Sequence, residues 1–230
     1  MKRMVQPELL DALPPDDPSA RRSRRDLQRL NFIMRHHVCL IGALRKAVNG
    51  RLPERITELG AGDAQFLLRV AQSLAPRWTK VKVTLLDQQR STAAGALAGF
   101  ATLGWPAEEI VADALAWAED PRSGADIVVT NLFLHHLQAP QLVRLFAAIA
   151  QRARLFVAVE PRRSRWPLFC SRQLWMLGCN PITQHDAPLS VRAGFAGREL
   201  SALWPPARDW ELTEARAGLF SHLFVARSIK

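Results

Sequence analysis

The segment RITELGAGDAQF (55–66) places an acidic residue and three small residues at alternate positions. Glu58 is followed by Gly60, Gly62 and Ala64. Glycine lacks a side chain and adopts positive φ freely, so a ligand can lie against backbone N–H groups at such a turn. The spacing differs from the dinucleotide fingerprint G-x-G-x-x-G, because glutamine stands where its third glycine would be. A tight turn without a ligand is the alternative.

Two further carboxylates favour a ligand over a bare turn. Asp87 ends the apolar run VKVTLLD (81–87), where a carboxylate can accept hydrogen bonds from both hydroxyls of a ribose. Asp113 ends the next run of this kind, EEIVAD (108–113). The pattern therefore indicates a ligand that contains a nucleoside.

Histidines supply candidates for proton transfer, because imidazole titrates near neutral pH. His135 and His136 follow an apolar run, and His185 precedes Asp186, which could orient its ring. Each is a candidate general base. One histidine of the pair could instead bond to backbone at a helix start, and His185 could lie in a polar turn. We favour His135 over His136 as the residue that faces a cleft.

The elements that carry these residues alternate in type. Strands are predicted at 55–59, 81–87, 108–113, 125–131 and 153–160, and helices at 64–75, 91–103 and 139–151. Alternation of this kind predicts an α/β fold with a doubly wound, mostly parallel, Rossmann-like sheet. WELTEARAG and LFSHLFVARSI predict an antiparallel pair near the C terminus. In such sheets ligands bind beyond the carboxyl ends of the strands.

The chain is predicted to divide at about residue 50. Residues 1–50 are expected to form an N-terminal helical cap, in which one helix begins near Ser19 or Ser23 and ends at Asn49 and Gly50. His36 and His37 on this helix are interpreted as surface or cap residues. Residues 51–230 are expected to form the Rossmann-like domain, with an insertion at about 161–190.

The net charge of +10 is concentrated in two segments. Residues 1–50 and 151–175 each carry an excess of five positive charges, which could attract phosphates, an anionic membrane surface or only solvent. Three cysteines without ligand spacing indicate neither disulfides nor a metal site and favour the cytoplasm. No apolar run approaches the roughly 20 residues that a membrane span needs.

Over roughly residues 50–160 the sequence resembles the class I S-adenosylmethionine-dependent methyltransferases. The resemblance implies that S-adenosylmethionine is the cofactor. It implies contacts to the methionine part from ELGAGDA, with Glu58, Gly60, Ala61 and Gly62, and from Asn131 and Leu132. It also implies that Asp87 binds the ribose and that Gln88, Asp113 and Ala114 lie at the adenine.

A narrower resemblance is to bacterial small-molecule methyltransferases of phenolic-lipid, quinone and polyketide pathways. It rests on HDAPLSVRAGFAGREL (185–200), NLFLHH and PELLD…LNFI. It implies O-methylation of a phenolic or quinol-like acceptor and an acceptor pocket built from the segment after the fifth strand. The candidate acceptor-binding residues are Trp166, Trp175, Met176 and Arg192. An amphiphilic acceptor and peripheral contact with a membrane would suit the mixture of Arg and Trp.

Two other functions stay open at this stage. An RNA-modifying methyltransferase would suit the positive charge. An amino-methylating DNA enzyme is disfavoured, since the (N/D)-P-P-aromatic motif is replaced by Asn131-Leu132-Phe133-Leu134. A methyltransferase fold that has become a binding module is disfavoured by the presence of Glu58 and of the two aspartates that follow the second and third strands.

Overall fold

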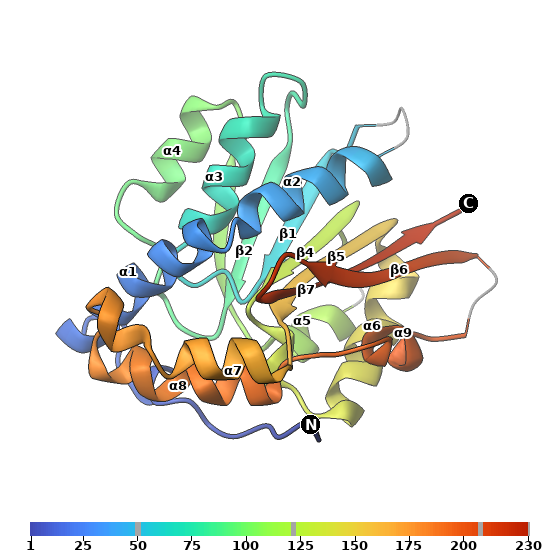
Figure 1. Ribbon diagram of the computed structural model, residues 1–230. Coiled ribbons are helices and arrows are strands. Elements are labelled where there is room, and N and C mark those ends of the chain that lie inside the picture. Colours follow the sequence, from blue (N-terminus) through green and yellow to red (C-terminus); the bar gives the residue numbers. More distant parts are fainter. Residues whose placement is uncertain (49–51, 121–122, 207–208, 230) are drawn as a thin grey trace.

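The computed structural model describes residues 1–48, 52–120, 123–206 and 209–229. A seven-stranded sheet crosses the molecule in the order β3-β2-β1-β4-β5-β7-β6 (Figure 1). Its strands are β1 (Arg55–Leu59), β2 (Lys82–Asp87), β3 (Ala107–Val111), β4 (Ile127–Asn131), β5 (Leu155–Pro161), β6 (Trp210–Ala217) and β7 (Ser221–Ser228). β1 to β5 are parallel, whereas β7 is antiparallel to β5 and to β6. The α/β fold class and the antiparallel C-terminal pair predicted from sequence are confirmed.

Helices cover both faces of the sheet, as continuous burial of the central strands requires. One face packs against α2 (His36–Ala47), α3 (Gln65–Leu74) and α4 (Ala96–Thr102). The other packs against α5 (Ala114–Glu119), α6 (Ala139–Arg152) and α9 (Glu199–Leu203). β4 and β5 are buried along their whole length. The strand order reverses between β1 and β4, so a ligand site is expected beyond the carboxyl ends of these two strands.

The N-terminal helix is interrupted, which the sequence did not predict. α1 spans Pro18–Ile33, and α2 begins at His36 after two intervening residues, because Arg35 takes a left-handed conformation at φ 57°. The cap of α1 is Asp17, whose carboxylate accepts from the N–H groups of the second and third helical residues, so the expected caps Ser19 and Ser23 are wrong. The expected end at residues 49–50 lies outside the described residues.

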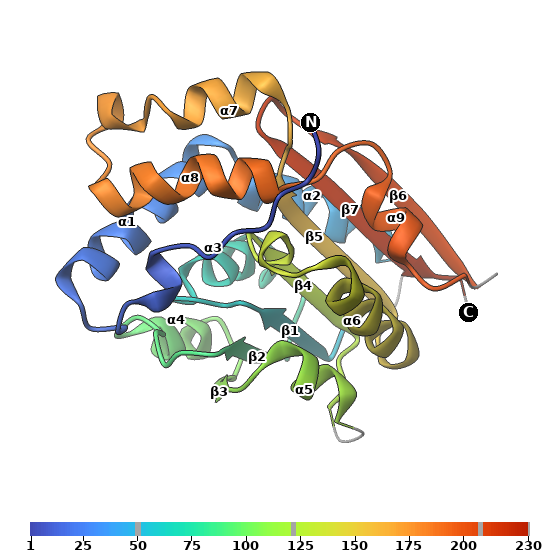
Figure 2. The same cartoon turned by 90° about the horizontal axis from the view of Figure 1, so that it is seen from below.

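A second group of helices lies over the carboxyl ends of the parallel strands (Figure 2). α7 (Arg165–Ser171), the 3-10 turn η3 (Leu174–Leu177) and α8 (Pro181–Ala193) follow β5, and α8 packs against α1 and α7. The chain's first residues run along the same side and include η1 (Leu10–Ala12). No helix among the described residues is long and apolar enough to cross a membrane.

Candidate active site

The turn from β1 into α3 needs small residues for two separate reasons. Gly60, Gly62 and Ala64 all have positive φ, at 69°, 54° and 62°. A Cβ on Gly60 would also lie 2.5 Å from Cδ2 of Phe133, closer than real atoms approach. A Cβ on Gly62 would meet nothing within 4 Å, so its backbone borders open space. Ala64 is buried and keeps the turn tight, at the cost of a conformation that L-residues avoid.

Glu58 is a buried carboxylate that lacks a hydrogen-bond partner for one of its oxygens among the described residues. It is 1% exposed, it lines the cavity at the glycine turn, and its Oε2 has no hydrogen-bond partner among the described residues. Burial, followed by the nearby charges of Asp63 and Asp87, raises the pKa of Glu58 well above its ordinary value. A cationic group donating hydrogen bonds would relieve this cost, so the position fits the ammonium of an amino acid.

Two carboxylates at the ends of β2 and β3 form the adjoining wall. Asp87 accepts from the N–H of Gly62 at 2.8 Å and from that of Gln89 at 2.9 Å. Asp113 caps α5 through Oδ1, and its Oδ2 accepts from the side-chain amide of Gln88 at 2.9 Å. These bonds fix the acidic side chains beside the glycine turn, where acceptor oxygens suit the hydroxyls of a ribose and an amino group on a base.

Asn131 is held in place by a histidine that the sequence analysis had interpreted as a surface or cap residue. His36 is 1% exposed and bridges Oδ1 of Asn131, at 2.8 Å, and Oγ of Ser221, at 2.6 Å. Burial lowers the pKa of His36 to about 4, so the ring is neutral and can both donate and accept. The neighbouring Leu132 lines the cavity at φ 54°, a strained backbone of the kind found at binding sites.

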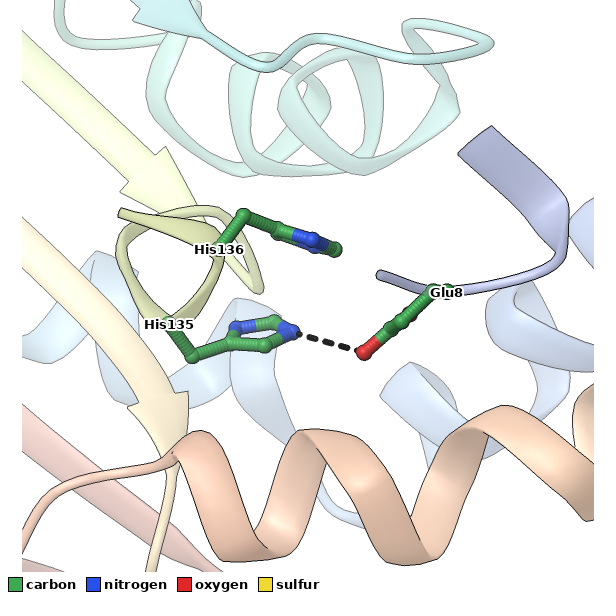
Figure 3. A group of neighbouring side chains, drawn as sticks. All are labelled: Glu8, His135 and His136. Carbon is green, nitrogen blue, oxygen red and sulfur yellow. Dashed lines mark ion pairs between the residues drawn. The ribbon is translucent and has the colours of Figure 1, made fainter. Parts of the chain in front are cut away.

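His135 lies between two carboxylates, those of Glu8 and Glu160; Figure 3 shows the one of Glu8. Its Nδ1 is 2.8 Å from Oε2 of Glu160, and its Nε2 is 3.4 Å from Oε1 of Glu8. Burial acts to lower the pKa of His135, but the two carboxylates outweigh it and raise the pKa to about 9. Glu160 is fully buried and also accepts from the backbone N–H groups of residues 133 to 135. At neutral pH His135 is therefore an imidazolium.

His136 faces the cavity and is only partly buried. Its side chain is 25% exposed, and its Nδ1 is 3.1 Å from Oδ2 of Asp11 on the N-terminal segment. Its ring centroid lies 4.1 Å from that of His135. Together with Glu8 the two rings offer three metal-binding atoms within 4.8 Å of one another. In this cluster Glu8 faces the imidazolium of His135.

The N-terminal segment (residues 1–13) brings two of these acidic groups, Glu8 and Asp11, to the site. Both belong to the PELLD motif of the family resemblance, but neither was predicted as a site residue. Arg3 anchors it by donating to the carbonyl oxygens of Ala193, at 2.7 Å, and of Leu137, at 2.9 Å. Asp186 on α8 accepts from the N–H groups of residues 9 and 10. His185 bonds to Asp186 at 2.8 Å, as expected, but its ring is half exposed and does not line the cavity.

A cavity of about 830 Å³ joins these groups, near the upper end of the roughly 300–1,000 Å³ typical of ligand pockets. All ten candidate cofactor residues line it: Glu58, Gly60, Ala61, Gly62, Asp87, Gln88, Asp113, Ala114, Asn131 and Leu132. Of the candidate acceptor residues only Met176 does; Trp166, Trp175 and Arg192 lie outside its lining. The apolar remainder of the lining includes Leu27, Leu30, Ile33, Pro167, Leu174 and Val191.

No protein-family model and no curated protein matches the sequence. Solved structures do match. The plantazolicin methyltransferase BpumL, solved in complex with SAH, superposes with a TM-score of 0.67 at 13% identity, over 93% of this chain and 91% of its own. The mitomycin 7-O-methyltransferase MmcR superposes with a TM-score of 0.60 at 17% identity, over 95% of this chain and 60% of its own. The pyocyanin biosynthetic protein PhzM superposes with a TM-score of 0.57 at 16% identity, over 93% of this chain and 59% of its own.

The chain has the methyltransferase fold. In this fold, the glycine turn after β1 and the acidic residues after β2 and β3 lie around one cavity at the point where the strand order reverses. The helices over the carboxyl ends of the strands enclose the other half of that cavity.

Proposed function

We propose that the protein is an S-adenosylmethionine-dependent methyltransferase that O-methylates a phenolic or quinol-like small molecule. The observation that carries the proposal is Glu58 at the glycine turn, a buried carboxylate whose Oε2 has no hydrogen-bond partner among the described residues. A carboxylate in this position stabilises an amino acid ammonium, and the fold neighbours BpumL and MmcR are methyltransferases. Biosynthetic neighbours, including PhzM, support a place in secondary or lipid metabolism.

The residues around the turn suit each part of this cofactor. Glu58 would face the ammonium, and the exposed backbone at Gly62 would lie along the methionine part. Asp87 offers acceptor oxygens to the ribose hydroxyls, while Asp113 and Gln88 lie where an adenine would fit. Asp87 already accepts hydrogen bonds from the loop. When a ribose binds, we expect Asp87 to give up part of these bonds and to accept hydrogen bonds from the ribose hydroxyls.

The remaining half of the cavity is apolar and suits an aromatic acceptor. α1 contributes Leu27, Leu30 and Ile33, and the segment after β5 contributes Leu174 and Met176. Apolar walls exclude water, which would otherwise solvate the acceptor oxygen and compete with it for the methyl group. The chain's own contribution is then chiefly alignment and proton removal.

His136 is assigned as the general base. A phenol has a pKa near ~10 and is a weak nucleophile while it keeps its proton. S-adenosylmethionine held by Glu58, Asp87 and Asp113 would supply a methyl group on a positive sulfur, which would become neutral when the methyl group passes to the acceptor oxygen. His136 takes the phenolic proton, and Asp11 stabilises the resulting imidazolium. His135 already carries a proton, so it orders Glu8 and Glu160 instead of accepting one.

The test is methyl transfer itself. The protein is incubated with S-adenosylmethionine carrying an isotopically labelled methyl group and a panel of alkylated phenols and quinols. We expect at least one compound to gain one labelled methyl group on oxygen, located by mass spectrometry and NMR. Structured RNA is run in parallel. Labelling of RNA alone, or of nitrogen in place of oxygen, would contradict the proposed acceptor class.

A further inference from the structure

An apolar rim surrounds the mouth of the cavity. Ile33, Met176 and Leu177 line the cavity, yet they are 57%, 67% and 50% exposed at the outer surface. Because these side chains both line the cavity and are exposed to solvent, apolar surface is continuous from the interior of the cavity to the exterior of the protein.

Aromatic residues of α7 and η3 extend this rim. Trp166 and Phe169 on α7 are both more than half exposed, and their rings stack with centroids 5.8 Å apart. Trp175 on η3 is exposed by a similar fraction. The inner side of α7 is buried at Pro167 and Ser171, so the helix turns its aromatic side chains outward. Figure 2 shows α7 as the outermost helix over this side.

The exposed charge of α7 and of the turn after it is positive. Residues 162–177 contain four arginines and no acidic residue, and of these Arg163 is buried and paired with Glu199. The guanidinium groups of Arg165 and Arg172 are exposed and make no ion pair within the described residues. On α1, Arg29 donates to the carbonyl oxygen of Leu177 at 2.8 Å, which joins that helix to η3. We call the following set the rim surface: Arg29, Ile33, Arg165, Trp166, Phe169, Arg172, Trp175, Met176 and Leu177.

We propose that the rim surface binds the headgroup region of an anionic phospholipid bilayer, so that the cavity mouth opens onto the membrane. Tryptophan rings favour the membrane–water interface, and arginines near it are attracted to anionic headgroups. The aliphatic side chains at the mouth then reach the acyl boundary. One consequence, that an apolar acceptor enters the cavity directly from the bilayer, rests on the proposed function.

The aliphatic part of the rim distinguishes a bilayer from a nucleic acid. Phosphates and stacked bases would pair with Arg165, Arg172 and the tryptophans, but they would leave Ile33, Met176 and Leu177 in water. A bilayer offers partners to both kinds of side chain. Because these aliphatic residues also line the cavity, their contact with acyl chains leads an apolar molecule toward the site.

Sedimentation with vesicles tests the proposal. The full chain is mixed with vesicles of phosphatidylcholine alone or of phosphatidylcholine with phosphatidylglycerol. We expect binding to the mixed vesicles, weaker by about tenfold or more with phosphatidylcholine alone, and reduced by added salt. Each protein is also titrated with S-adenosylhomocysteine, which reports on the proposed function without lipid.

Paired variants separate the two parts of the surface. Trp166→Ala with Trp175→Ala removes apolar contact, and Arg165→Gln with Arg172→Gln removes charge. We expect each pair to weaken vesicle binding by about tenfold. The matched control is Arg77→Gln with Leu97→Ala, one exposed arginine and one exposed leucine near α3 and on α4. The control should bind vesicles as the wild type does.

Several outcomes would overturn the lipid proposal. These are equal binding to both vesicle types, binding that survives both pairs of substitutions, or a tryptophan-dependent dimer that forms in place of vesicle binding. Structured RNA that binds through the same arginines and displaces vesicles would also do so. Wild-type protein that binds S-adenosylhomocysteine but no vesicles refutes the rim surface alone, whereas the reverse result refutes the proposed function alone.

Discussion

Glu160 and His135 form a hydrogen-bonded ion pair at 2.8 Å, in a place where both side chains are almost completely buried. Three backbone N–H groups also bind the carboxylate of Glu160, which fixes the turn that carries both His135 and His136. The pair therefore sets the position of the histidine assigned as base while itself keeping its proton.

This pair makes stability depend on pH in alkaline solution. The pKa of His135 is raised from 6.5 to about 9 in the folded protein, so the stabilising contribution is complete below pH 6.5 and is lost as the pH rises through about 9. We expect the free energy of unfolding, measured by urea titration, to fall across this range. His135→Gln should flatten the fall and cost about 3–5 kcal/mol at neutral pH, because Glu160 stays buried without its partner. Parallel pH curves for the two proteins would contradict the assignment.

Turnover should distinguish His136 from His185. Once an acceptor is found, His136→Ala is expected to lower kcat by about 10²- to 10⁴-fold while leaving the affinity for S-adenosylhomocysteine unchanged, because only proton removal is lost. His185→Ala serves as the matched control, since that ring is half exposed and outside the cavity lining. Full activity of His136→Ala would remove His136 from the role of base.

Two substitutions in the glycine turn, Ala64→Gly and Gly60→Ala, should change the stability of the protein in opposite directions. Ala64→Gly relieves a residue at φ 62° and should range from neutral to about 1 kcal/mol stabilising. Gly60→Ala adds a Cβ 2.5 Å from the ring of Phe133 at φ 69°, so it should destabilise the protein and weaken cofactor binding. Thermal unfolding and cofactor titration measure both effects. A stable Gly60→Ala protein with normal affinity would show that the turn does not require close approach.

We expect the cluster of Glu8, His135 and His136 to be balanced by the proton on His135 and to work without a metal ion, so chelation should have no effect. We expect methyl transfer and thermal stability to be the same before and after treatment with EDTA. Activity that is lost with EDTA and restored by Zn²⁺ would show that the three side chains, which offer ligand atoms within 4.8 Å, bind a metal ion instead.

The parallel strands and the glycine turn could be predicted because their signals are local. Apolar runs such as 125–131 and the alternate small residues after Glu58 occupy a few consecutive positions and have one structural interpretation. The predicted helix at 91–103 is shorter, since Gly95 at φ 83° delays its start to residue 96.

The other half of the site depends on contacts between distant segments. Glu8 and Asp11 reach the cavity only because Arg3 and Asp186 anchor the N-terminal segment, and no periodicity encodes such anchoring. Trp166 and Trp175 were expected in the acceptor pocket, but α7 and η3, which carry them, are too short for their sequences to show which side turns inward. Sequence favoured His135 as facing the cleft; both histidines line the cavity, and their different hydrogen-bond partners arise from the tight turn η2 (Leu134–His136).

Calorimetric titration with S-adenosylhomocysteine tests the central proposal most directly. We expect micromolar binding by the wild type, affinity reduced about tenfold or more in Asp87→Ala and in Glu58→Gln, and no change in Glu54→Ala at the opposite end of β1. Glu58→Gln should also unfold at a higher temperature, since it removes a buried carboxylate whose Oε2 has no hydrogen-bond partner among the described residues. No binding by folded wild-type protein, or equal binding by all four proteins, would contradict the assignment of this cavity to S-adenosylmethionine.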